Sequence, residues 1–144
     1  MNENHRRALK SGLLLVERCL HEIEDALRSH RSNSALYSIR RDIGPRTETR
    51  ILIAIKSMLD EIGRIKKEFG LSVDEESLKS RVHAALAEIW VNLEELRPEG
   101  MGAYGRMAEE EERVLKYHIL KLLRIWGDLH NILDEPNLLQ QDRS

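Results

Sequence analysis

The sequence predicts an all-α protein: an antiparallel four-helix bundle with one short additional helix after helix one. Apolar residues recur at alternating steps of three and four along four long segments, as they do on one face of a helix. Aromatic residues make up only 4% of the chain, and aliphatic side chains suit helix-to-helix packing. No segment shows the strict alternation of a strand. The 144 residues fit one all-helical domain spanning 1–144.

Helix one is predicted from Asn4 to Ser29. Its inner stripe follows the heptad steps of left-handed bundle packing, with Leu9, Leu13, Val16, Leu20, Ile23 and Leu27. The segment His30–Gly44 comes next, and a structureless connection of this length is unusual in a compact domain. Ser34 precedes a short apolar group and can act as an N-cap. We therefore predict the short additional helix in this segment.

Helix two is predicted from Pro45 to Phe69, because proline is favourable in a first turn and Gly70 can close the last one. Its inner stripe is Ile51, Ile55, Met58, Ile62, Ile65 and Phe69. The connection that follows is short, so helices two and three should be antiparallel neighbours.

Helix three should begin after Ser72, which forms a capping-box pattern with Glu75. It should run to about Arg97, where Pro98 stops it. Its stripe is Leu78, Val82, Leu86, Ile89, Leu93 and Leu96. A loop over Glu99–Arg106 then leads to the last helix.

The last helix, Met107–Leu133, is the longest periodic segment and the predicted centre of the bundle. One stripe holds Leu115, Ile119, Leu122, Trp126, Leu129 and Leu133, and a second beside it holds Val114, Leu123, Ile125 and Ile132. Carboxylates at Glu109–Glu112 suit a helix start, and Pro136 marks the end. We expect residues 136–144 to form a frayed tail.

The net charge of −2 hides an asymmetry between the two halves of the chain. Residues 1–72 carry 14 Lys/Arg and 10 Asp/Glu, a net +4, whereas residues 73–144 carry 9 and 15, a net −6. Two interpretations remain open: solvated helix faces with intramolecular ion pairs, or a basic surface that binds something anionic, such as the acidic surface of a second copy.

The single cysteine, Cys19, excludes an intrachain disulfide and a cysteine-rich zinc site. We expect it to be a small buried side chain on its helix. The chain lacks a run long enough for a membrane span and a convincing signal peptide, so a cytoplasmic location is expected. No motif predicts a metal or cofactor, and the glycines of Gly100–Gly105 follow a helix instead of the strand that dinucleotide binding needs.

An Arg-rich segment is the most concentrated basic feature. It comprises Arg28, Arg31, Arg40, Arg41, Arg46 and Arg50, with Tyr37 among them. Arginine can grip phosphates or carboxylates and tyrosine can stack on a base. The alternative is that these arginines pair with glutamates of the acidic half. The resulting hypothesis is a non-catalytic binding module, self-associating as a dimer, that contacts nucleic acid or an acidic protein surface through this segment.

Arg113 and His118 provide an alternative function. Their R-x4-H spacing is similar to that of the HEPN ribonucleases, which are also small helical proteins. The resemblance implies metal-independent RNA cleavage at a dimer cleft, with His118 in proton transfer and Arg113 on the phosphate. Such spacings also arise by chance in a chain this rich in arginine, and Val114 stands where the family often has a polar residue, so the chain is not assigned to it.

Overall fold

The computed structural model describes residues 1–29 and 34–136. This part of the chain contains five α-helices, one 3-10 turn and no strand, which confirms the all-α class. Its contacts form two compact units, Met1–Val73 and Asp74–Ser144. The boundary falls where the charge changes sign, since residue 73 is uncharged and the units carry 14 − 10 = +4 and 9 − 15 = −6.

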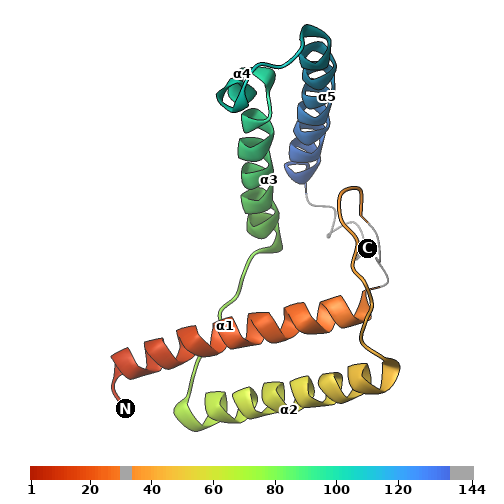
Figure 1. Cartoon of the computed structure of the whole chain (residues 1–144). Helices are drawn as coiled ribbons and strands as arrows, with labels where there is room; N and C mark the ends of the chain where they lie inside the picture. The colour runs from red at the N-terminus through yellow and green to blue at the C-terminus, as the bar shows by residue number, and fades with distance from the viewer. Residues whose placement is uncertain (30–33, 137–144) are drawn as a thin grey trace. The chain divides into compact units, whose positions relative to one another are not determined.

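The first unit is an antiparallel hairpin of α1 (Glu3–Arg28) and α2 (Pro45–Phe69), drawn side by side in Figure 1. Its helix termini follow the local rules. Asn2 caps α1 by accepting a hydrogen bond from the backbone N–H of His5 at 2.8 Å. Gly70 ends α2 in the left-handed conformation, φ 62°, where a side chain would be strained. The predicted bounds of both helices are therefore close to the observed ones.

The predicted short helix after helix one is wrong for the described part of its segment. Residues 34–44 contain no helix, and residues 30–33 lie outside the described residues. The backbone N–H of Ser34 donates to the carbonyl of Tyr37 at 2.8 Å and so closes a turn. Leu36 is exposed. A single helical turn needs an apolar face to pack, because its own hydrogen bonds do not offset the cost of nucleation.

The second unit pairs α3 (Leu78–Glu95) with α5 (Glu109–Leu133), which run antiparallel to each other (Figure 1). The indole N–H of Trp126 donates to the backbone carbonyl of Leu86 at 2.7 Å and joins the C-terminal third of α5 to the middle of α3. Between these two helices in the sequence come the short helix α4 (Pro98–Met101) and the 3-10 turn η1 (Gly102–Tyr104). The segment predicted as a loop is thus partly helical.

The predicted start of helix three is also corrected. α3 begins at Leu78, where the side chain of Ser77 accepts a hydrogen bond from the backbone N–H of Ser80 at 3.2 Å. The hydroxyl of Ser72 instead accepts a hydrogen bond from Lys10 Nζ at 2.9 Å, within the first unit. Ser72 and Ser77 are both possible N-caps of this helix. Because the hydroxyl of Ser72 contacts Lys10, Ser77 becomes the cap.

Each long helix buries one apolar side chain. Leu20, Ile55, Leu86 and Ile119 retain only 3 to 6% of their surface exposed. All four belong to the predicted inner stripes. Cys19 is exposed, so its predicted burial is wrong: it precedes Leu20 by one residue, which turns it about 100° away from the helix contact.

The inner stripes are only half covered within the hairpins. In every long helix the residue three positions after the buried one is exposed: Ile23, Met58, Ile89 and Leu122 retain 45 to 49% of their surface. Three residues correspond to about 300°, so each exposed residue is turned about 60° to the same side of the contact. Because the paired helices are antiparallel, these rotations point to the same side of the hairpin. Each hairpin therefore has one exposed apolar face.

The structure thus shows α1·α2 and α3·α5 packing, while the four-helix arrangement and the single domain stay predictions. Over the residues described, no helix is both long and apolar enough to cross a membrane.

Candidate functional site

The Arg-rich segment lies where α1 ends and α2 begins. Arg28 is in the last turn of α1, Tyr37, Arg40 and Arg41 are in the connection, and Arg46 and Arg50 are in the first turns of α2. Arg31 lies outside the described residues. A shallow hollow of ≈ 170 Å³ is lined by Ala26, Leu27, Ile39, Arg40, Arg41, Asp42, Ile43 and Glu48. The first unit therefore brings the described members of the segment to one end of the hairpin.

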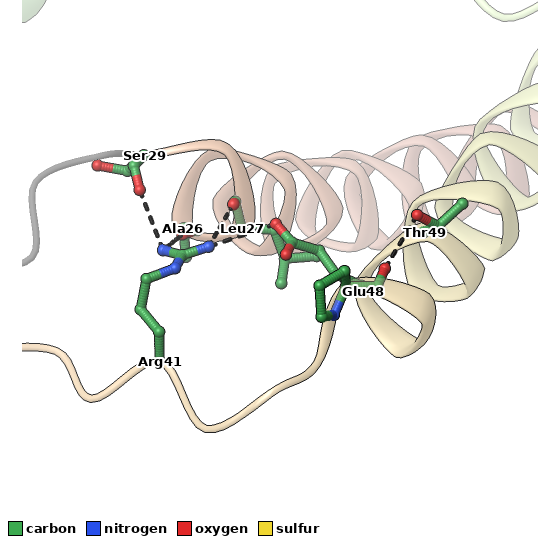
Figure 2. Close-up of polar contacts among 7 residues, drawn as sticks. Ala26, Leu27, Ser29, Arg41, Glu48 and Thr49 are labelled. Atoms are coloured by element: carbon green, nitrogen blue, oxygen red, sulfur yellow. Dashed lines mark hydrogen bonds and ion pairs between the residues drawn. The ribbon is translucent and has the colours of Figure 1, made fainter.

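The guanidinium of Arg41 contacts backbone carbonyls at the end of α1 (Figure 2). Its Nη1 donates to the carbonyls of Ala26 at 3.3 Å and Ser29 at 3.0 Å, and its Nη2 donates to the carbonyl of Leu27 at 2.7 Å. Nη2 also lies 3.3 Å from Glu48 Oε1 in α2. The last carbonyls of a helix have no partner within the helix, and the planar guanidinium satisfies several at once. Arg41 is therefore a cap of α1 and a link to α2.

Arg40 and Tyr37 face solvent. The Arg40 side chain is 88% exposed, and its Nη2 lies 3.3 Å from Asp42 Oδ2. Exposed ion pairs of this kind contribute little to stability, so Arg40 can exchange this partner for another anion. Tyr37 is exposed as well. Arg40 lines the hollow, and neither Arg40 nor Tyr37 is buried in the fold.

The side chains of Arg28, Arg46 and Arg50 form no hydrogen bond or ion pair with any residue that the structure describes, and all three residues are exposed. Arg46 and Arg50 are one turn apart and share a face of α2. No side chain caps the start of α2, and Pro45 at its first position has no N–H to donate. The next backbone N–H groups, from Arg46 and Thr47, are therefore open to solvent.

The electrostatics of this helix start favour an anion. Two arginines lie in the first two turns, where the helix dipole is itself positive. The one carboxylate of the first turn, Glu48, is paired with Arg41. Cationic side chains and open N–H groups together can bind a phosphate or a carboxylate.

The Arg113 and His118 pair does not converge within one chain. Arg113 Nη2 donates to both carboxylate oxygens of Glu110, at 2.6 and 2.7 Å. His118 is exposed and lies edge-on to Tyr117, with ring centroids 5.2 Å apart. Five residues along α5 separate their directions by about 140°. A shared phosphate would require both the loss of the Glu110 pair and a second chain.

A cluster in the second unit was not anticipated from the sequence. His83 Nε2 of α3 lies 3.2 Å from Asp134 Oδ1, and His130 Nδ1 of α5 lies 3.3 Å from Asp134 Oδ2. The ring of His130 contacts His83 at 5.5 Å and Trp126 at 5.3 Å, measured between centroids. His130 and Asp134 are four residues apart, a spacing that signals a helical pair. His83 comes from another helix, so no local signal links it to them.

This cluster ties the start of α3 to the end of α5. In the described part of the chain, no three His, Cys, Asp or Glu residues are arranged to hold a metal ion. The second unit also has an open hollow of ≈ 670 Å³ beside η1, lined in part by Arg106 and Glu112. It includes glycines of the Gly100–Gly105 segment, which here connects helices.

No family model matches the chain, and no curated protein or solved structure matches it either. Of the predicted site residues, Arg28, Tyr37, Arg40, Arg46 and Arg50 face solvent, whereas Arg41 is occupied by the fold.

Proposed function

We propose that this protein is a non-catalytic, self-associating helical binding module that contacts an anionic partner at the start of α2. One observation carries the contact: Arg46 and Arg50 are exposed and unpaired among the described residues, beside open backbone N–H groups. Arg28, Arg40 and Tyr37 flank them. Phosphates of nucleic acid and carboxylates of an acidic protein both fit these donors.

The contact is tested by binding labelled single-stranded RNA and duplex DNA at low and physiological salt. We expect binding that weakens as salt rises, because phosphate contacts release counterions. The double variant Arg46→Glu/Arg50→Glu should lose it. Its matched control is Lys56→Glu/Lys67→Glu, which makes the same change in charge elsewhere on the exposed surface of α2.

The two variants separate a local site from general electrostatic attraction. Equal loss of binding in both would show that net charge alone attracts the nucleic acid. Absence of binding at low salt would remove the nucleic-acid partner. The same variants would then be tested against a poly-glutamate peptide. Equal binding of wild type and Arg46→Glu/Arg50→Glu would contradict the proposed binding site.

We further propose that the two hairpins complete an antiparallel four-helix bundle in a single domain. Two observations support this: each hairpin has an exposed apolar face formed by residues such as Ile23 and Met58, or Ile89 and Leu122, and the units carry opposite net charges. Burying about half of such a side chain contributes on the order of 1 kcal/mol. The connection Gly70–Ser77 is eight residues and can span up to about 28 Å.

The bundle is tested by placing a charge on one face. Met58→Asp should convert a single thermal transition into two, because a buried unpaired carboxylate would separate the hairpins. Ile53→Asp is the control: it is an exposed apolar residue of the same helix, about 140° away from Met58. A wild-type chain with two separate transitions, or identical melting of the two variants, would contradict the bundle.

A further inference from the structure

Helix α5 exposes a second apolar row beside the face that the proposed bundle would bury. Val114, Ile125 and Ile132 retain 46 to 59% of their surface. Relative to the buried Ile119, they lie about 120° to 140° around the helix on the side of Leu122. In α3, the positions at the same offsets from the buried Leu86 hold Arg81 and Asn92, which are polar. The apolar surface is therefore wider on α5 than on its hairpin partner.

Three polar residues complete this row into a heptad seam. Val114, His118, Lys121, Ile125, Asp128 and Ile132 follow steps of four and three along α5, the period of helices that pack along their length. Lys121 and Asp128 form no ion pair with any described residue. Their charges are thus available to a partner that lies along the seam, and we call these six residues the α5 seam.

The α5 seam is complementary to itself in one orientation. Two parallel copies in register would place Lys121 opposite Lys121 and Asp128 opposite Asp128, and like charges repel. Two antiparallel copies about a twofold axis place Val114 opposite Ile132 and His118 opposite Asp128. The aliphatic stem of Lys121 then covers Ile125 of the second copy, with its ammonium beside Asp128. Polar residues within a seam select such a register.

We propose that the α5 seam is the surface on which a second copy of this chain packs, antiparallel and about a twofold axis. The proposal rests on the self-association put forward above and names its surface. A symmetric contact of this kind uses the same patch on both copies. A single pair of helices buries a small area, so the dimer should dissociate on dilution.

The test is the mass of the full chain in solution, measured by light scattering over a dilution series. We expect the wild type to be a dimer at high concentration and Ile125→Lys to be a monomer at the same concentration. Ile53→Lys, the same change at an exposed position of α2, should remain a dimer. Both variants should keep their helices, because Ile125 and Ile53 are exposed and lie outside the buried core of their hairpins. Circular dichroism checks this.

A cross-link checks the orientation without relying on a destabilised variant. In a Cys19→Ser background, His118→Cys/Asp128→Cys should form a covalent dimer on oxidation. These positions are about 15 Å apart along one helix, too far for a disulfide within a chain. Lys56→Cys/Lys67→Cys on α2 should give no specific dimer. A dimer that survives Ile125→Lys would place the interface elsewhere and leave self-association intact, whereas a monomeric wild type would contradict both proposals.

Discussion

The contacts that join the two helices within each hairpin differ in kind between the two hairpins. In the first unit, arginines act on backbone carbonyls at both ends: Arg41 at the end of α1, and Arg6, whose Nε donates to the carbonyl of Phe69 at 3.3 Å, at the end of α2. In the second unit, Trp126 joins α5 to α3 and the carboxylate of Asp134 joins two histidines. Their apolar cores are alike, with one buried residue per long helix.

This difference shows that the formal charge of a segment does not measure its free charge. The first unit has a net charge of +4, but Arg41 is occupied by carbonyl groups and by Glu48. The basic surface available to a partner is therefore narrower than the Arg-rich sequence suggests. The second unit has a net charge of −6, yet its distinctive surface is the largely apolar row of α5.

The largest effect should come from the shared feature, the buried leucines. We expect Leu20→Ala in the first unit and Leu86→Ala in the second each to lower the free energy of unfolding by about 2 to 4 kcal/mol, because each leaves a cavity in a small core. Amide hydrogen exchange locates the loss. If the hairpins form one bundle, each variant should reduce protection in both units, and loss confined to the mutated hairpin would contradict the bundle.

Arg41→Lys should have an intermediate effect, confined to the first unit. Lysine keeps the charge but cannot reach three carbonyls with a planar fork. We expect a loss of about 1 to 2 kcal/mol, the contribution of a few partly exposed hydrogen bonds to a charged group. Thermal melting measures it, and Arg40→Lys is the control because Arg40 contacts only Asp42 among the described residues. Equal melting of the two variants would show that the Arg41 contacts do not stabilise the hairpin.

Asp134→Asn should have the smallest effect, confined to the second unit. The side chains of His83, His130 and Asp134 are between 38 and 47% exposed, so solvent screens their attraction. We expect a loss of about 0.5 kcal/mol, detectable as a small fall in the midpoint of urea unfolding. Glu135→Gln, which changes the exposed neighbouring carboxylate outside the α5 seam, provides the comparison. If Asp134→Asn lowered the free energy of unfolding more than Arg41→Lys does, the Asp134 contacts would stabilise the protein more than the Arg41 contacts.

Local signals predicted most of the helices. The heptad steps, Pro45, Gly70 and Pro98 act within one or two turns, so their consequences are present in the sequence. The four buried residues are all members of stripes that the sequence defines. The error at Ser34 arises because a serine cap is weak unless the helix after it has something to pack against. The error at Ser72 arises because its hydroxyl contacts Lys10, while Ser77 caps α3.

Of the candidate site, the sequence determined which residue types are concentrated between α1 and α2, but not which of them are free. Arg40 and Arg41 are neighbours with the same side chain, and only the folded connection directs one to the carbonyls of α1 and the other to solvent. His83 meets Asp134 only because α3 packs on α5. Likewise, the stripe of each helix is periodic in the sequence, while tertiary packing decides which half is covered. Periodicity is a property of neighbours along the chain, and pairing depends on residues that only folding brings together.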